Sequence, residues 1–547
     1  MENSKSHISP VEHIQVEDPV SSNVDSSPEH LPRSVFGLSI AGTFVFLYLR
    51  TFLLPATPFV AHDDQILFFA RAVRMVHGQV LYRDFFELVT PGTDLLYATT
   101  FHLSGIHAWI MQAWSIALGL TLSCVITQIA NKVLHGPLVL LPALLFLVFD
   151  FDIALDPTHH WYSTLAALVA ISVLIGGTDL LRVFVAGSLC GIATLFTQTH
   201  GTLTFAALII YLLWLKRSEN SKVRAFSLLT QLTTLILPFV LILSCGLGYY
   251  IHEAGFRIIF SDIVLFPLQF LSSGDVNSPQ TYLRQLPPVH KLSDIVRLIP
   301  AVFLYAVIPY SYFFGLYQLW RKRTALPAKL RQQLVLLHLV GLALFLAVAS
   351  GPRLHRLCTV APPAILICVW LFSQLGFACR FVRNLLCFLA AAYAFLLPFS
   401  RQVQQHFILN LPIGRTAFHD PLEFQEFQWL AQRTHPSELF FNQTALSLYL
   451  SLDNPTASEF VNEDDFTRPE QVAAVIQSLQ RNPPHFIMLL PEMSSSSNVH
   501  DHSAPFRRYV HDNYHLSQIF PLNHNFRYEE LWELGNPASP RTEIDEK

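Results

Sequence analysis

Two adjacent carboxylates, Asp63 and Asp64, follow the first long apolar segment of the chain. Carboxylates beside a bilayer are costly to desolvate, so they need a partner or a task. One of them could act as a general base that takes the proton of an attacking hydroxyl group. The alternative is structural, because Asp is a good N-cap for a helix that begins near Ile66. The residue pattern leaves both interpretations open.

Other polar residues interrupt apolar segments further along the chain. His159 and His160 precede two aromatic residues, a combination that suits sugar binding but is equally typical of an aromatic belt at a membrane interface. Gln198 and His200 break another apolar stretch, and we expect them to line a cavity because exposing them to lipid would be costly.

A third polar cluster, Arg353-Leu354-His355-Arg356, precedes a late apolar segment. Guanidinium groups bind phosphate in a fork, so Arg353 and Arg356 are candidates for binding a lipid phosphate. The alternative is that these arginines extend to lipid headgroups and only anchor the chain.

The composition indicates a polytopic membrane protein. Hydrophobic residues make up 52% of the 547, and charged residues 14%, against about 25% in soluble proteins. A formal net charge of -4 without a long basic patch argues against nucleic-acid binding. We count about eleven apolar segments that could cross a membrane, near residues 35–55, 108–130, 136–151, 161–177, 181–198, 201–215, 226–250, 298–320, 332–349, 358–377 and 383–400.

The distribution of charge predicts the orientation of these segments. Basic residues cluster in short turns, near Arg217, Arg323 and Arg380, which the positive-inside rule places in the cytoplasm. We therefore expect a disordered cytoplasmic tail at 1–33, a transmembrane domain at 34–400 and an outer-face α/β domain at 401–547. Two long outer loops, 56–107 and 252–297, should flank the site. The first should carry two interfacial helices, Ile66–Val76 and Asp94–Leu103.

The first outer loop resembles a known family. It contains Gly-x-x-x-Tyr-Arg-Asp-Phe-Phe at 78–86, then Pro91-Gly92, then Phe-His-Leu-Ser-Gly at 101–105. With the acidic pair and an Ala-Arg at 70–71, this arrangement is similar to the GT-C glycosyltransferases, especially relatives of protein O-mannosyltransferases, the lipid A aminoarabinose transferase and rhizobial lipopolysaccharide-core transferases. The pair here is Asp-Asp where the family commonly has Asp-Glu, and either residue could occupy the catalytic position.

The resemblance implies a GT-C-like α-helical fold and an inverting transferase that uses a polyprenyl-phosphate sugar. Asp63 or Asp64 would be catalytic, and the acceptor would be an envelope glycolipid, a glycan or a protein at the outer face of a bacterial inner membrane. Some members use a divalent cation and others do not, so the resemblance assigns no cofactor. It adds to the substrate-binding candidates the loop residues Arg71, Tyr82, Arg83, Asp84 and Glu87.

Two other functions are consistent with an apolar chain of this kind. A lipid or glycan transporter would use polar breaks in its membrane segments as substrate sites. We find no internal repeat, and the acidic pair lies in an outer loop instead of at mid-membrane, which disfavours transport. A non-catalytic envelope assembly protein would leave the acidic pair with no task beyond capping.

Overall fold

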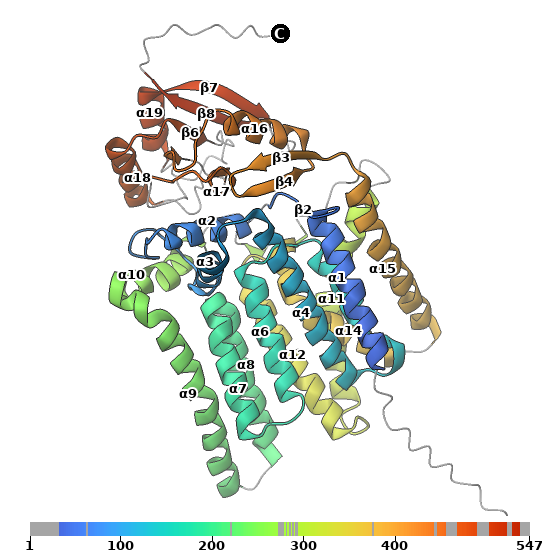
Figure 1. The fold of residues 1–547 in the computed structure, drawn as a ribbon. Coiled ribbons are helices and arrows are strands. Elements are labelled where there is room, and N and C mark those ends of the chain that lie inside the picture. The colour runs from blue at the N-terminus through green and yellow to red at the C-terminus, as the bar shows by residue number, and fades with distance from the viewer. Residues whose placement is uncertain are drawn as a thin grey trace, which may run out of the picture.

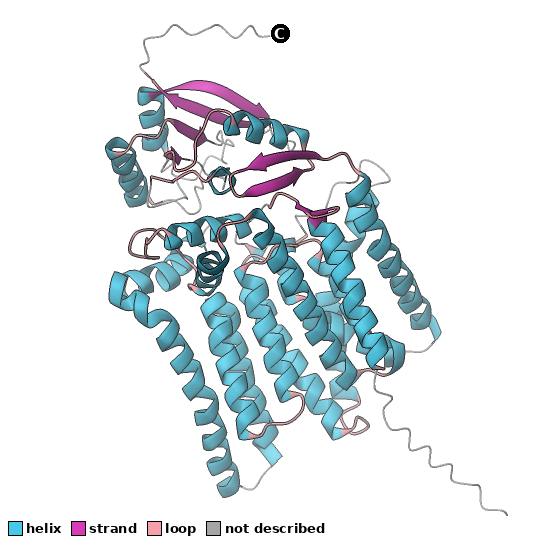
Figure 2. Ribbon diagram, viewed as in Figure 1, coloured by secondary structure: helices cyan, strands magenta, loops and turns pink. Residues whose placement is uncertain are grey.

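The structure is a computed structural model, and it describes residues 32–61, 64–218, 221–271, 278–279, 282–283, 286, 289, 294–374, 377–441, 446–455, 468–489, 503–521 and 528–535. A body of long helices carries a smaller mixed domain at one end (Figure 1). The described strands gather at that same end (Figure 2). The predicted tail at 1–33 lies almost entirely outside the described residues, and so does Asp63.

Each of the eleven predicted membrane segments is helical. Among the described residues, seven helices are long and apolar enough to cross a membrane, and α13 with α14 forms an eighth span bent by 66°. The other three segments are shorter, so the predicted number of about eleven exceeds the seven or eight that meet the length criterion. The helices are α1 (Arg33–Thr51), α4 (Ala108–Val133), η1 (Gly136–Val139), α5 (Leu141–Phe146), η2 (Leu147–Phe151), α6 (His159–Leu174), α7 (Leu180–Phe196), α8 (Gln198–Leu215), η3 (Lys216–Ser218), α9 (Ser221–Ala254), α11 (Asp294–Arg321), α12 (Ala328–Val348), α13 (Leu354–Val360), α14 (Pro362–Gln374) and α15 (Phe377–Val403).

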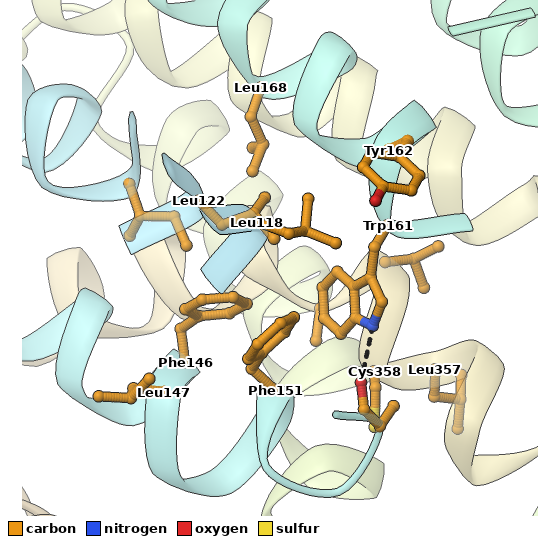
Figure 3. Close-up of a cluster of buried hydrophobic side chains, with 14 of the residues drawn as sticks. Leu118, Leu122, Phe146, Leu147, Phe151, Trp161, Tyr162, Leu168, Leu357 and Cys358 are labelled. Carbon is orange, nitrogen blue, oxygen red and sulfur yellow. Dashed lines mark hydrogen bonds between the residues drawn. The ribbon is translucent and has the colours of Figure 1, made fainter. Parts of the chain in front are cut away.

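Small residues and buried aromatic rings hold the helical body together. A Cβ atom on Gly187 of α7 would overlap the backbone of Leu235 in α9, so glycine permits these helices to approach closely. Phe146, Phe151 and Trp161 pack face to edge in the interior (Figure 3). The indole of Trp161 is fully buried and donates a hydrogen bond of 2.9 Å to the Ala154 carbonyl. Trp161 is therefore a core residue and not part of an interfacial belt.

The described parts of the two predicted outer loops lie between the helical body and the smaller domain (Figure 1). The first loop forms α2 (Asp64–Val76) and α3 (Gly92–Ser104), which cover both predicted interfacial helices. The second begins with α10 (Phe256–Phe260) and the π-helical η4 (Ser261–Leu265) and η5 (Pro267–Leu271). Tyr82 and Phe85 of the first loop pack against Tyr250 and Ile263, so the two loops share one apolar cluster.

The C-terminal residues form a mixed α/β domain. Its four-stranded sheet has the order β5-β6-β8-β7, in which only the β5–β6 pair is parallel. The β3–β4 hairpin is antiparallel and lies beside the short β1–β2 pair that follows α1. The elements are β1 (Phe52–Leu53), β2 (Thr57–Pro58), β3 (Phe407–Leu411), β4 (Gly414–Phe418), α16 (Pro421–Ala431), β5 (Phe440–Phe441), α17 (Leu446–Leu450), α18 (Pro469–Arg481), β6 (Phe486–Leu489), α19 (Ala504–Asn513), β7 (Tyr514–Pro521) and β8 (Tyr528–Leu534).

Candidate functional site

The segment that leads to the acidic pair is held from two sides. The Val60 N–H donates to the Ala417 carbonyl of β4 at 2.9 Å, and the Ala61 N–H donates to the phenol oxygen of Tyr449 at 2.7 Å. From α4, the Gln112 amide donates to the Phe59 carbonyl at 2.8 Å. Helix α2 then begins at Asp64, whose side chain is exposed. The acidic pair therefore follows a backbone that the C-terminal domain and α4 hold in place.

Three histidines from two helices meet near α2. The rings of His159 and His160, at the start of α6, are 3.9 Å apart, and His160 lies 5.0 Å from His200 of α8, measured between centroids. Nδ1 of His200 is 2.8 Å from the Ser163 hydroxyl, and Phe68 of α2 packs on His159 at 5.1 Å. All three rings are largely buried or half-buried. The structure thus brings together two polar clusters that are separate in the sequence.

Arg356 connects these histidines with the acidic end of α2. Its side chain is half-buried at the start of α13, and one guanidinium nitrogen donates to the Gly351 carbonyl at 3.4 Å. Asp64 lies close enough to attract this guanidinium electrostatically, and Arg353 lies close enough to repel it. The charge of Arg356 also reaches His159, His160 and His200. By contrast, His355 is exposed on the same helix.

Arg71 and Glu87 form a buried ion pair with each other. Their side chains are 3% and 1% exposed, so neither is open to solvent. Glu87 also accepts hydrogen bonds of 2.8 Å from the backbone N–H groups of Leu88 and Val89. The pair therefore fastens α2 to the turn that precedes α3.

Tyr82, Arg83 and Asp84 make their contacts within the outer loops. The Tyr82 hydroxyl donates to the Val89 carbonyl at 2.6 Å, and burial raises the pKa of this phenol well above its usual value. Arg83 pairs with Asp84 at 2.9 Å and with Glu253 at 2.6 Å. The hydrogen bond from Arg83 lowers the pKa of Asp84. These contacts attach the first outer loop to the end of α9.

Comparison with solved structures identifies the fold. No family model matches the sequence, and no curated protein matches it either. ArnT from Cupriavidus metallidurans, bound to undecaprenyl phosphate, superposes with a TM-score of 0.53 at 13% identity, covering 93% of this chain and 99% of that one. The chain has the GT-C fold.

Two further solved structures are similar to this chain. The apo state of the same Cupriavidus metallidurans ArnT gives a TM-score of 0.52 at 12% identity, with coverage of 93% and 99%. The apo oligosaccharyltransferase of Archaeoglobus fulgidus gives 0.48 at 11% identity, with coverage of 84% and 69%. The match to ArnT spans nearly the whole of both chains.

Within this GT-C fold, Gln198 joins the two outer loops. Its side-chain amide donates to the Leu88 carbonyl at 3.0 Å and to the Ile263 carbonyl at 3.1 Å. Gln198 is the first residue of α8, two positions before His200. It therefore links the loop contacts to the histidine cluster through a single helical turn.

Sequence reasoning missed Arg468 and Asp262, which interact with each other where the C-terminal domain meets the two loops. Arg468, from the C-terminal domain, lies over the rings of Phe86 and Phe266 at 4.8 and 4.9 Å. Burial raises the pKa of Asp262 to about 6, although the charge of Arg468 opposes that shift. The only sequence signal for Arg468 is its place before Pro469 at a helix start, which indicates a helix and not a contact with the outer loops.

Metal binding was left open by the resemblance. Within the described ranges, no group of three or more His, Cys, Asp or Glu side chains is arranged to hold a metal ion. Asp63 lies outside those ranges. The rings of the three histidines are tilted against one another at the starts of α6 and α8.

Proposed function

We propose that the chain is an inverting membrane glycosyltransferase that uses a polyprenyl-phosphate sugar donor. The observation that carries this proposal is that Asp64 of α2 lies within electrostatic reach of Arg356 of α13, whose charge also reaches three histidines. A carboxylate next to a cationic pocket suits a reaction in which one group loses a proton while another gains negative charge. The GT-C fold supports the proposal, as does the undecaprenyl phosphate bound to the similar ArnT.

The reaction is a single displacement at the anomeric carbon. The acceptor oxygen attacks that carbon, and Asp63 or Asp64 takes its proton. The bond between the anomeric carbon and the phosphate oxygen breaks, and its electron pair leaves with the polyprenyl phosphate. One displacement inverts the anomeric centre and forms no covalent enzyme intermediate. Because the donor carries a lipid chain, the reaction takes place at the membrane boundary.

Arg353 and Arg356 stabilise the departing phosphate in this proposal. Charge develops on the phosphate oxygens as the bond breaks, and preorganised cations stabilise that charge best when they are shielded from water. Arg356 is half-buried, and Arg353 precedes the same helix. The rings of His160 and His200 lie beside Arg356 and offer ring nitrogens for hydrogen bonds to the sugar or phosphate. Ser163 orients the ring of His200.

The remaining candidates from the first outer loop shape the wall of the site. Arg71 and Glu87 are occupied with each other, and Arg83 with Asp84 and Glu253. Their contacts support a positioning role: they hold α2, and with it Asp64, against the body. Tyr82 and Gln198 fix the neighbouring turn through hydrogen bonds to the backbone.

The acceptor is an envelope glycolipid, a glycan or a protein at the outer face of a bacterial inner membrane. The sugar is a hexose or pentose carried by the lipid. The orientation that the positive-inside rule predicts makes the N-terminus cytoplasmic. It places the C-terminal domain in the outer compartment together with the acidic pair. Mass spectrometry of envelope glycolipids and glycoproteins from a deletion strain would identify the product that is lost.

The test is transfer by the purified chain in liposomes that contain undecaprenyl-phosphate sugars and an envelope extract as acceptor. We expect Asp63→Asn or Asp64→Asn to abolish transfer while the protein still inserts at normal levels. Asp512→Asn alters an exposed carboxylate of the C-terminal domain and should leave transfer unchanged. Near-normal turnover in both site variants would refute the catalytic assignment. Movement of the lipid donor across the bilayer without transfer would favour a transporter.

A further inference from the structure

Arg468 stands at a fixed point of the C-terminal domain, where this domain meets the two outer loops. It directly precedes α18, and Pro469 occupies the first helical position, for which its ring is pre-organised. The backbone N–H of Arg468 donates to Oε1 of Gln471 at 3.1 Å, so the start of the helix is capped. The side chain of Arg468 therefore extends from a backbone position that is held in place.

This side chain contacts one aromatic ring from each outer loop. Its guanidinium carbon lies 4.8 Å from the ring centroid of Phe86 in the first loop and 4.9 Å from that of Phe266 in the second. The two rings meet edge to face, with their centroids 4.9 Å apart. An aromatic face attracts a cation, and the attraction is stronger where water is excluded. Phe266 is 1% exposed, so its side of the contact is shielded from water.

The charge of Arg468 also acts on the carboxylates of the loops. Asp262 belongs to the second loop, and the charge of Glu87 in the first loop reaches it. These two carboxylates repel each other, whereas Arg468 attracts Asp262. Burial raises the pKa of Asp262 to about 6, so this carboxyl group is mostly ionised at pH 7. Removing Arg468 would therefore take away an attraction and leave a repulsion between the loops.

Phe86 connects this contact to helix α2. It adjoins Glu87, whose carboxylate forms the buried ion pair with Arg71 of α2. Arg71 comes seven residues after Asp64, which places both on the same side of α2 and about 10 Å apart along its axis. A displacement of Phe86 would therefore reach α2 through a single buried ion pair.

We propose that Arg468 is a positioning residue, which holds the two outer loops together and thereby keeps α2, and with it Asp64, in place. The proposal rests on the proposed glycosyl transfer, because that reaction is what requires Asp64 to be in place. A displacement of about 1 Å at a reacting group can slow a reaction about 100-fold. Because Arg468 would act on the carboxylate and not on the donor phosphate, its removal should affect kcat more than KM.

The first test is the kinetics of transfer in liposomes that contain undecaprenyl-phosphate sugars. We expect Arg468→Met to lower kcat about tenfold or more and to leave KM for the lipid donor nearly unchanged. Arg468→Lys keeps a cation beside the rings and should recover part of the loss. Arg481→Met removes an exposed arginine at the other end of α18 and should behave like the native chain. An unchanged kcat in Arg468→Met, or a rise in KM alone, would overturn the proposal.

The second test is a double-mutant cycle that needs no assay of transfer. Midpoints of thermal unfolding in detergent would be compared for Arg468→Met, Phe266→Leu and the double variant. The double variant should shift the midpoint by less than the sum of the two single shifts, because each single change already removes the same contact. Additive shifts would overturn the proposal.

The two tests separate a failure of this proposal from a failure of the proposed function. If the native chain transfers sugar and Arg468→Met has the native kcat, the positioning role is refuted while glycosyl transfer stands. If the native chain transfers no sugar, the proposed function is wrong, and the cycle alone decides whether Arg468 holds the loops together. If Arg468→Met does not fold, Phe86→Leu replaces it at a half-buried position. An unchanged kcat in Phe86→Leu would then overturn the proposal.

Discussion

The phenol oxygen of Tyr449 accepts a hydrogen bond of 2.7 Å from the backbone N–H of Ala61, across 388 residues of sequence. Tyr449 is 1% exposed, lies 4.0 Å from the sulfur of Met111 in α4, and packs edge-on against Phe427. Three parts of the chain therefore meet at one buried side chain. Because Ala61 closely precedes the acidic pair, this contact links the C-terminal domain to the start of α2, where we propose that the catalytic carboxylate lies.

Tyr449→Phe should lower kcat for transfer more than it raises KM for the lipid donor. The variant keeps the ring but leaves the buried Ala61 N–H without its acceptor, at a cost of about 1–3 kcal/mol. Steady-state kinetics with a titrated donor would measure the effect. Tyr528→Phe, at a 37% exposed position of β8, is the matched control. If activity falls only in proportion to the amount of folded protein, and kcat and KM do not change separately, Tyr449 has only a structural role.

Arg356→Ala should raise the apparent KM for the lipid donor, and Arg353→Ala should do so to a smaller extent. Arg356 lies within electrostatic reach of Asp64 and of the histidines, whereas Arg353 only precedes the same helix. Lysine at either position should rescue only in part, because it cannot bind phosphate in a fork. Arg415→Ala changes an exposed arginine of β4 and serves as the control. Unchanged donor dependence in both variants would reassign the arginines to membrane anchoring.

Arg71→Met should destabilise the chain strongly, because it leaves the carboxylate of Glu87 buried without its partner. Removing one member of a buried pair typically costs about 3–5 kcal/mol. The midpoint of thermal unfolding in detergent would show the loss, and Arg71→Met/Glu87→Leu should recover part of it. Arg83→Met breaks an exposed pair and should change the midpoint little. Similar unfolding midpoints for Arg71→Met and Arg83→Met would contradict the prediction that the buried ion pair contributes more to stability than the exposed one.

The C-terminal domain should lose stability as the pH rises from about 4.5 to about 8. Burial, reinforced by Asp420 and Glu529 and opposed by Arg401, raises the pKa of Glu423 from 4.5 to about 8. Burial also raises the pKa values of Glu426 and Glu529, which hydrogen-bond to each other. Over this range the folded state binds more protons than the unfolded state, so raising the pH favours unfolding.

Thermal unfolding of the chain at pH 5, 7 and 9 would measure this dependence. Glu423→Gln should flatten it, because the amide stays neutral at every pH. Glu470→Gln, at an exposed position of α18, should leave the slope unchanged. Stability that rises with pH in the native chain would contradict the direction of these pKa shifts.

Membrane topology can be tested with single cysteines in a chain whose seven native cysteines have been replaced. An impermeant thiol reagent on intact cells should label Ser104→Cys of the first outer loop and Gln518→Cys of the C-terminal domain. It should spare Thr324→Cys, which lies in the basic turn between α11 and α12. All three positions are exposed. Labelling of Thr324→Cys without lysis would mean that the orientation is the reverse of the predicted one. Labelling of Ser104→Cys without labelling of Gln518→Cys would place the C-terminal domain in the cytoplasm.

Local patterns in the sequence predicted the helices of the apolar segments. Each long apolar segment is helical because a chain in lipid must satisfy its own backbone hydrogen bonds. The segments that begin at Ile66 and Asp94 lie outside the predicted membrane segments, and they became α2 and α3 as expected. The β3–β4 hairpin and β7 were not predicted. Phe407–Leu411 and Tyr514–Pro521 have weak patterns of their own, and their pairing with other strands makes them strands.

The sequence alone determined the membrane character, the GT-C resemblance and the residue types of the site. It did not determine which of those residues meet. Arg71 and Glu87 were predicted beside the substrate, yet they form an ion pair with each other. Asp64 and Arg356 are separated in the sequence by most of the helical body, yet they lie within electrostatic reach of each other. Helix formation depends on neighbours along the chain, but these encounters depend on how α2, α6, α8 and α13 pack. Only the tertiary structure decides that packing, because it is set by shape and burial between residues that are distant in the sequence.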